Sequence, residues 1–337
     1  MSSMDSESAT FDKNQTSIYI SVIITAYNRR QFLFESMNSV LNQSLSKELY
    51  EIILCKNFED PEIDQFAMTN NIKLVLTPNV CSMGEMLYLG ISTARGNVLS
   101  FLDDDDIYQQ NRLERVLEMF NKFVNLGYYK HQFRYIDENG VFLNRLTESK
   151  NAAVFKNSDI IYVKNSEKIS KSSVYNGVVP DMNSTSMAIR KDILTRNVNL
   201  FLKINDKPDA VLFFFALISS KDLLFDSANL SLYRIHMKRT TKQIRGYPVD
   251  KTMLLLIDQL YKLNKQKFLF FFKQKMAVGR ISTLVDLPDH HKREMIVAIV
   301  KLILAKRPVD PFSELWALKI GIIYLLDPKK SKLLKNH

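Results

Sequence analysis

Cysteine and glycine are both scarce in this chain of 337 residues, and each shortage excludes a class of protein. The two cysteines, Cys55 and Cys81, lie inside or beside apolar segments and have neither metal-ligand nor redox spacing. A reducing compartment therefore fits better than a disulfide scaffold. The nine glycines form neither GxGxxG nor GxxxxGKS/T, which argues against the usual dinucleotide fingerprint and against a P-loop.

The sequence also lacks long apolar runs. No stretch of about 18 consecutive apolar residues occurs, so we expect no membrane-spanning helix. Residues 1–17 are polar and serine-rich and contain no apolar core of a secretory signal, so we expect a loose N-terminus and a cytoplasmic protein. The hydrophobic fraction of 46% indicates a globular fold, with length for one large domain or for one domain with an extension.

Acidic residues are few in the last quarter of the chain. Residues 251–337 contain 17 Lys and Arg against 7 Asp and Glu, an excess equal to the net charge of +10 of the whole chain. One interpretation is peripheral contact with an anionic membrane on its inner face, in which the apolar run Phe268–Phe272 takes part. The alternative is a group of helices that packs on the rest of the protein with a solvated basic face. No nucleic-acid-binding motif accompanies the charge, so we expect no nucleic acid partner.

Four consecutive carboxylates follow one apolar strand. Val98–Leu102 is predicted to be a strand buried on both faces, and Asp103–Asp106 come directly after it. Such a cluster would repel itself unless some carboxyls stay protonated or a cation binds. Carboxylate oxygens favour Mg²⁺ or Mn²⁺, with diphosphate oxygens completing the coordination. The alternative is capping of a helix expected over Ile107–Val124, which would account for Asp106 and one neighbour only.

Strands and helices alternate in the first part of the chain. The expected strands are Ile18–Thr25, Tyr50–Cys55, Ile72–Leu76 and Val98–Leu102, and the expected helices are Phe32–Leu41, a short helix opened by Asp60-Pro61, and Met83–Ala94. This alternation predicts an α/β fold with a mostly parallel sheet and helices on both faces. Ligands of such sheets bind beyond the carboxyl ends of the strands, where Tyr27, Asn57 and the acidic run stand.

The pattern changes after residue 127. Tyr129–Leu143 reads as a hairpin with an Asn-Gly turn, and the polar segment 144–175 as a mobile loop of the kind that covers active sites. The remaining expectations are a strand at Asn183–Ile189, a helix at Asp209–Ile218, a strand at Leu223–Tyr233, and amphipathic helices from Lys251 onward.

Several segments, in the right order, resemble the family 2 glycosyltransferases of GT-A fold. SVIITAYNRR (21–30) is similar to the family's first strand and Tyr-Asn turn, and YEIIL (50–54) to its second strand. Gly90, Ala94 and Gly96 fit the spacing of a family helix, and FLDDDDIYQQNRLE (101–114) fits the segment with the acidic motif. The resemblance covers about Ile18–His236. It implies metal-dependent, inverting transfer of a sugar from a nucleotide-diphosphate donor to a hydroxyl of a glycan, polysaccharide or lipid-linked acceptor.

The resemblance implies a division of the chain and two groups of ligand-binding residues. The division is a flexible N-terminus (1–17), a GT-A domain (18–245) with a nucleotide-binding part (18–126) and an acceptor part (127–245), and a basic helical extension (246–337). The nucleotide group is Thr25, Ala26, Tyr27, Asn57, Asp103 and Asp104, with Thr25 and Tyr27 beside the base. The metal group is Asp103, Asp105 and His236. The alternative for Tyr27 and for His236 is a role in packing.

A base must take the proton of the acceptor hydroxyl, and the resemblance places it late in the domain. The family uses an Asp, often in a Glu-Asp pair, and Pro208-Asp209 stands at the matching position. Asp209 is therefore the expected catalytic base, and Asp206 is the substitute candidate. The alternative for Asp209 is an acidic residue that favours the first turn of a helix.

The chain departs from the family pattern at identifiable positions. Lys56-Asn57-Phe58-Glu59 replaces the usual Asp-Asp-x-Ser, and Tyr88 stands where the family has Asn. These departures leave the donor open, and together with Pro208 they keep a non-catalytic nucleotide-sugar-binding subunit as an alternative. A nucleotidyltransferase, which also needs carboxylates and a metal, is the second alternative.

Overall fold

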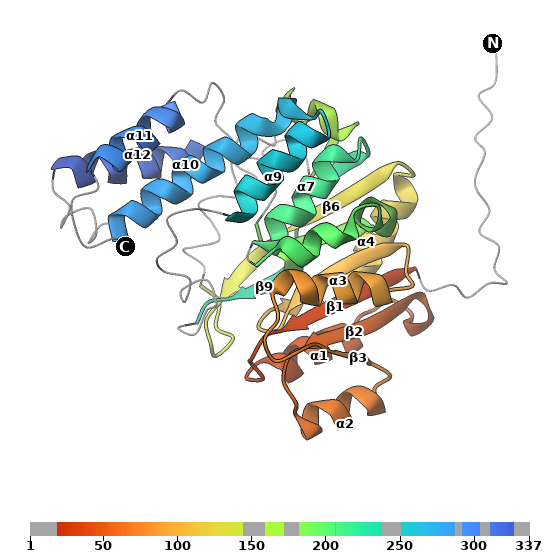
Figure 1. Ribbon diagram of the computed structural model, residues 1–337. Coiled ribbons are helices and arrows are strands. Elements are labelled where there is room, and N and C mark those ends of the chain that lie inside the picture. Colours follow the sequence, from red (N-terminus) through yellow and green to blue (C-terminus); the bar gives the residue numbers. More distant parts are fainter. Residues whose placement is uncertain are drawn as a thin grey trace, which may run out of the picture.

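The computed structural model describes residues 19–143, 159–171, 182–205, 207–236, 251–286, 292–303 and 311–326 (Figure 1). The first part consists of β1 (Ile20–Ala26), α1 (Leu33–Leu41), β2 (Tyr50–Lys56), α2 (Pro61–Thr69), β3 (Lys73–Leu76), α3 (Met83–Thr93), β4 (Val98–Asp103), β5 (Ile107–Tyr108) and α4 (Arg112–Lys122). The second part consists of β6 (Leu126–Ile136), β7 (Ile160–Val163), the 3₁₀ turns η2 (Ser166–Lys171) and η4 (Ser184–Ser186), β8 (Met187–Arg190), α6 (Lys191–Thr195), the 3₁₀ turn η5 (Val198–Lys203), α7 (Pro208–Ile218) and β9 (Asp222–Arg234). The chain continues with α9 (Lys251–Lys262), α10 (Leu269–Asp286), α11 (Lys292–Ile303) and α12 (Pro311–Leu326).

The nine strands of the described residues form one sheet. Their order is β3-β2-β1-β4-β8-β6-β9-β5, with β7 paired to β9. β1 to β4 are parallel, as the alternation of strands and helices predicts. β8 runs antiparallel to both β4 and β6, and the rest of the sheet is mixed. The predicted α/β class with a GT-A type sheet is confirmed.

Helices cover both faces of the sheet (Figure 1). Successive side chains of a strand point to opposite faces. In β1, Ile23 joins the core shared with α3 and α7, whereas Val22 and Ile24 join the core shared with α1 and α4. Burial on both faces explains why β1 is a continuous run of mostly apolar, β-branched residues rather than an alternating one.

Local sequence signals start the helices that pack on the parallel strands. Asp60 caps α2 by accepting the backbone N–H groups of Glu62 and Ile63, and Pro61 takes the first helical position. Ser82 and Glu85 form a capping box at the start of α3. α3 then approaches the sheet closely at Gly90, where a Cβ atom would lie 2.7 Å from Cγ2 of Ile23. The family-like glycine spacing therefore has a packing reason.

Three local predictions are wrong. Ile107 and Tyr108 do not start a helix, because they pair with β9 as strand β5, and α4 begins only at Arg112. The loop expected over 144–175 contains β7 and η2, while residues 144–158 and 172–181 lie outside the described residues. The strand expected at Asn183–Ile189 begins only at Met187, after η4. The short strands β5 and β7 are held by pairing with a distant segment, which local periodicity does not report.

The helices after residue 250 contribute to two separate cores. α9 and the start of α10 pack on the sheet domain, and Phe268 and Phe272 are buried there. For these two aromatic residues, the structure shows the alternative interpretation, in which the helices pack on the rest of the protein. The rest of α10 forms a second core with α11 and α12. Among the described helices, none has the length and the apolar character needed to cross a bilayer.

Candidate active site

The four carboxylates of Asp103–Asp106 lie in the turn that leaves β4. The turn is closed by a hydrogen bond from the Asp106 N–H to the Asp103 carbonyl oxygen, at 3.2 Å. β4 lies beside β1, with Asp103 paired to Thr25, and β2 lies on the other side of β1. The three strands that carry the predicted polar residues therefore end together, at one edge of the sheet.

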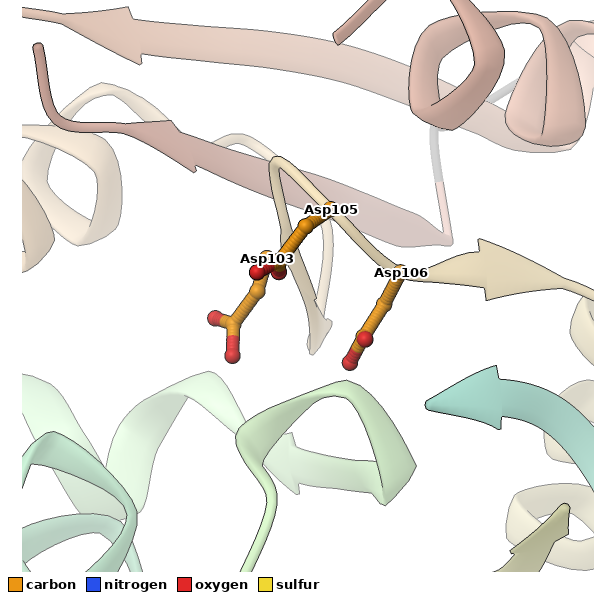
Figure 2. A group of neighbouring side chains, drawn as sticks. All are labelled: Asp103, Asp105 and Asp106. Atoms are coloured by element: carbon orange, nitrogen blue, oxygen red, sulfur yellow. The ribbon is translucent and has the colours of Figure 1, made fainter. Parts of the chain in front are cut away.

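Three of these carboxylates come close enough to hold one ion (Figure 2). Ligand oxygens of Asp103, Asp105 and Asp106 lie within 4.8 Å of one another. Oδ1 of Asp106 accepts the backbone N–H of Arg234 at 3.0 Å. Oδ2 of Asp106 is buried and has no hydrogen-bond partner in the described part of the chain. A buried carboxylate oxygen without a donor is costly, and a cation would satisfy it. The donor set of oxygens thus fits Mg²⁺ or Mn²⁺.

Burial and mutual repulsion set the protonation of the cluster. Burial, together with the charge of Asp105, raises the pKa of Asp103 to about 7. Burial also raises the pKa of Asp104 to about 7 and holds the pKa of Asp106 well above its ordinary value. Burial acts on Asp105 in the same direction, but the hydrogen bond with His236 and the charge of Arg29 lower its pKa. Binding of a divalent cation would therefore release protons from the cluster.

Arg29 places a positive charge against two of the carboxylates. Its Nε donates to Oδ2 of Asp104 at 3.0 Å, and its Nη2 donates to Oδ1 of the same residue. Nη2 also lies 2.8 Å from Oδ2 of Asp105. The paired contact is the bidentate geometry that a guanidinium forms with a carboxylate. Asp104 is thus paired with Arg29, a residue to which no sequence motif assigns a role.

His236 lies beside the acidic cluster. Its Nε2 is 2.8 Å from Oδ2 of Asp105 and 3.2 Å from Nη1 of Arg29, and Phe32 packs on its ring. A ring nitrogen carries either a proton or a lone pair, so it cannot satisfy both polar neighbours at once. The structure therefore places His236 beside Asp105 but outside the group of three carboxylates that could share one ion, and it also shows the packing contact of the alternative.

Asn57 supports the loops around the site. Its Oδ1 accepts the backbone N–H of Asn28 at 2.8 Å. Its Nδ2 donates to Oδ1 of Asn28 at 3.2 Å and to the carbonyl oxygen of Asn79 at 3.0 Å. Both amide hydrogens are used within the protein, so further contacts of Asn57 with a base are limited to its oxygen.

The other predicted nucleotide residues differ in exposure. Thr25 and Ala26 are buried at the end of β1, whereas Tyr27 is half-buried and packs partly against the core. Lys56, which replaces an expected Asp, is buried, and its Nζ lies 2.8 Å from Oδ1 of Asp64. The ammonium group of Lys56 is thus paired with a carboxylate of the same chain.

The turn η4 joins the acidic cluster to the predicted base. Ser184 Oγ donates to Oδ1 of Asp103 at 3.0 Å, and the Asp103 N–H donates to Oγ1 of Thr185 at 3.2 Å. The backbone N–H of Asn183 donates to Oδ2 of Asp209 at 3.1 Å. Asp209 also adds to the charge that raises the pKa of Asp103. The structure therefore brings Asp209 to the cluster, while Asp206 lies outside the described residues.

A fully buried arginine, Arg112, holds η4 through hydrogen bonds to its backbone. Arg112 donates through Nη2 to the carbonyl oxygens of Thr185 (2.9 Å) and Met187 (3.2 Å). Its Nη1 donates to Ser100 Oγ, and its Nε donates to Nε2 of His131 at 2.9 Å. No sequence signal marks Arg112 or η4, because each depends on contacts between distant segments, and the acidic run alone does not single out Asp106.

The sequence profile described as Glycosyl transferase family 2 matches residues 21–196. An uncharacterized glycosyltransferase of Nostoc sp. is 32% identical over 117 residues, which are 33% of this chain and 36% of that protein. An uncharacterized glycosyltransferase of Rickettsia prowazekii is 25% identical over 237 residues, 68% of each chain. The minor teichoic acid biosynthesis protein GgaA of Bacillus subtilis is 32% identical over 141 residues, 38% of this chain and 31% of that protein. The matches thus span about a third of the Nostoc and Bacillus proteins.

The fold is also similar to that of TarS from S. aureus. The structure of TarS residues 1–349 in complex with UDP-GlcNAc has a TM-score of 0.62 at 14% identity, and the match covers 94% of this chain and 89% of that chain. The structure of the same part of TarS in complex with UDP has a TM-score of 0.60 with the same coverage. At this identity, the comparison concerns the fold, including the helices after the sheet.

Proposed function

We propose that this chain, which belongs to the family 2 glycosyltransferases, transfers a sugar from a nucleotide-diphosphate donor to a hydroxyl acceptor. The observation that carries the proposal is the acidic cluster at the ends of the parallel strands, joined through η4 to Asp209. A nucleotidyltransferase would not account for the family match. Because TarS was crystallised with UDP and with UDP-GlcNAc, uridine nucleotides are the first donors to test.

In this proposal, Asp103, Asp105 and Asp106 hold Mg²⁺ or Mn²⁺, with His236 as a further ligand. The metal would supply positive charge to the diphosphate as it leaves. The orphaned Oδ2 of Asp106 supports this assignment, because it is buried where an ion would meet it. Arg29 holds Asp104 and Asp105 in place, and Tyr27 offers a ring face to the base.

Asp209 would take the proton of the attacking hydroxyl. One carboxylate oxygen accepts the Asn183 N–H and the other accepts the Ala210 N–H, so the side chain is oriented by two backbone donors. Attack from the side opposite the leaving diphosphate would invert the anomeric centre. Asp209 then acts only when the acceptor reacts, whereas the acidic cluster acts on the donor.

For the acceptor, we propose a hydroxyl on a polymer or on a lipid-linked glycan. The similarity to GgaA, a minor teichoic acid biosynthesis protein, supports a cell-surface polymer as the first candidate. The alternative of a non-catalytic nucleotide-sugar-binding subunit is an outcome of the assay described below.

We further propose that α11 and α12 contact an anionic membrane. The outer side of α12 carries Leu315, Ile322 and Leu326, which are 67%, 50% and 81% exposed, together with the exposed Lys319. The opposite side of α12 packs in the second core. Residues 292–337 contain ten Lys and Arg against four Asp and Glu, which complements anionic headgroups.

A nucleotide-sugar panel tests the reaction. Purified protein with Mn²⁺ or Mg²⁺ is mixed with UDP-, GDP-, CDP- and dTDP-sugars, and the melting temperature and the release of nucleoside diphosphate are measured. A donor at 100 times its Kd should stabilise the protein by about 2.7 kcal/mol. Metal-dependent stabilisation with release of nucleoside diphosphate is the expected result. Metal-dependent binding without release, in the presence of teichoic acid-type and glycan acceptors, would favour the non-catalytic subunit.

A further inference from the structure

Asn183 is a buried asparagine whose side-chain oxygen forms a hydrogen bond while its side-chain nitrogen, among the described residues, does not. It precedes η4 with φ at 64°, a left-handed conformation that Asn tolerates better than most residues. The residue is 4% exposed. Its Oδ1 accepts the N–H of Thr185 at 3.0 Å, but its Nδ2 has no hydrogen-bond partner among the described residues. A buried amide donor without an acceptor is rare and costly.

The surrounding turn cannot easily relax to satisfy this donor. Arg112 holds the carbonyl oxygen of Thr185 at 2.9 Å, and Lys130 Nζ donates to the Met182 carbonyl oxygen at 2.6 Å and to Ser186 Oγ. Lys130 and Arg112 are themselves buried. The turn is thus fastened on both sides of Asn183, and the orientation of the Asn183 amide is fixed by its own bond to Thr185.

The position of Asn183 indicates what its amide faces. Its own backbone N–H contacts the carboxylate of Asp209, and the next residue, Ser184, contacts the carboxylate of Asp103. Asn183 therefore lies between the residue proposed to bind the donor diphosphate through a metal and the residue proposed as the base. In the proposed reaction, the sugar that changes bonds must lie between these two groups.

The chemistry of the Asn183 amide N–H limits the kinds of group that it can bind. An amide N–H cannot ligate a cation, because it offers no lone pair, so the metal that would satisfy Asp106 cannot satisfy Asn183. A phosphate at this position would approach the neighbouring carboxylates of Asp103 and Asp209, whereas the cations of Lys130 and Arg112 bond to oxygen atoms of the turn itself. A neutral oxygen, either a hydroxyl or a carbonyl of a sugar substituent, meets no such repulsion.

We propose that Asn183 Nδ2 donates a hydrogen bond to a sugar oxygen at the reacting centre. This inference rests on the proposed function and assigns the residue to sugar recognition. The oxygen belongs either to the transferred sugar or to the acceptor, and the two sources give different kinetic effects.

The sharpest variant is Asn183→Asp, because it keeps Oδ1 for Thr185 and the tolerance for positive φ but replaces the donor by an acceptor. Asn183→Gly is the second variant, because glycine adopts the same φ without strain and adds no charge. The control is Asn71→Asp, an exposed asparagine with φ at 55° that lies outside the site. Melting temperatures and circular dichroism of the proteins without ligand show whether the fold is retained.

The measurement compares each nucleotide sugar with its own nucleoside diphosphate. Calorimetry with Mn²⁺ uses UDP-GlcNAc against UDP, and the corresponding pair for any other sugar that the panel identifies. If the oxygen is on the transferred sugar, Asn183→Gly should weaken binding of the nucleotide sugar by about 3- to 10-fold, and Asn183→Asp by more, with the affinity for UDP unchanged within about 2-fold. If the oxygen is on the acceptor, donor binding should stay constant while the KM for the acceptor rises by a similar factor.

Three outcomes separate this inference from the proposed function. Normal affinities and KM values in both folded Asn183 variants would overturn the inference and leave the proposed function standing. Equal loss of UDP and UDP-GlcNAc binding would also overturn it, because it would assign Asn183 to the metal-diphosphate site. A wild-type protein that binds no nucleotide sugar would overturn both proposals.

Discussion

Replacing Asp103 by Asn should stabilise the metal-free protein and at the same time remove its function. The carboxyl of Asp103 has a pKa of about 7, because it is buried and lies near the charge of Asp105. Asn has the same shape and keeps an oxygen to accept the Ser184 hydroxyl, which contacts Oδ1 at 3.0 Å. The variant therefore removes the charge without creating a cavity.

The magnitude follows from the pKa shift. A carboxyl whose pKa is raised from 3.8 to about 7 on folding makes the protein less stable as the pH rises from 3.8 to 7. At 1.36 kcal/mol per pKa unit, the limit above pH 7 is about 4 kcal/mol for an isolated group. Because neighbouring carboxyls share protons and water reaches Asp103, we expect about 1–2 kcal/mol. In a chain of this size, this corresponds to a rise in melting temperature of roughly 1–3 °C.

The assay is thermal unfolding in EDTA from pH 4 to pH 8. The difference between Asp103→Asn and wild type should be near zero at pH 4 and should grow toward pH 8. The control is Asp192→Asn, an exposed residue of α6 for which we expect a constant difference. Addition of Mn²⁺ should stabilise the wild type more than Asp103→Asn. A variant that is less stable than wild type at pH 8 in EDTA would refute the reasoning, because the interactions of the charged Asp103 carboxylate would then stabilise the fold by more than its burial and repulsion destabilise it.

Three further predictions concern other parts of the chain. Asp209→Asn should lower kcat by about two to four orders of magnitude with donor affinity nearly unchanged, and an equal loss of both would assign Asp209 a structural role. Burial lowers the pKa of His131 well below 6.5, so the free energy of unfolding should fall by up to about 1.4 kcal/mol per pH unit below pH 6.5. The His131→Gln variant should not show this fall, and curves of stability against pH that run parallel for variant and wild type would contradict the prediction. Leu315→Ser with Ile322→Ser should reduce flotation with anionic liposomes at low salt, whereas Val124→Ser, also exposed, should not; equal flotation of all variants would exclude the α12 face.

The parallel half of the sheet could be predicted from the sequence because its signals are local. Ile20–Ala26 and Tyr50–Lys56 are buried on both faces, and such strands must be apolar without alternation. Once the strands are parallel, their carboxyl ends meet at one edge, so the polar residues that follow them had to meet. The position of Asp103 and Asp105 in the cluster follows from this geometry alone.

The prediction failed where distant segments decide the local structure. Helix capping by Asp106 is the alternative that the sequence leaves open, but the residues after Asp106 pair with β9, and its side chain accepts the backbone N–H of Arg234 instead. The sequence predicts no role for Arg29, yet Asp104, 75 positions later, accepts hydrogen bonds from its Nε and its Nη2. Composition likewise located a basic region correctly but could not tell that Phe272 packs against Phe214.

The site as a whole depends on the pairing of β8 with β4, where the parallel strands meet their first antiparallel neighbour. β8 is antiparallel to β4, with Ser100 opposite Ala188 and Val98 opposite Arg190. In an antiparallel pair, the residues that precede one strand lie beside the residues that end the other. The turn before β8, which carries Asn183 and Ser184, must therefore lie next to Asp103, and the same turn reaches Asp209 at the start of α7. Had β8 been parallel to β4, this turn would lie at the opposite edge of the sheet, and the acidic cluster and the proposed base would not meet.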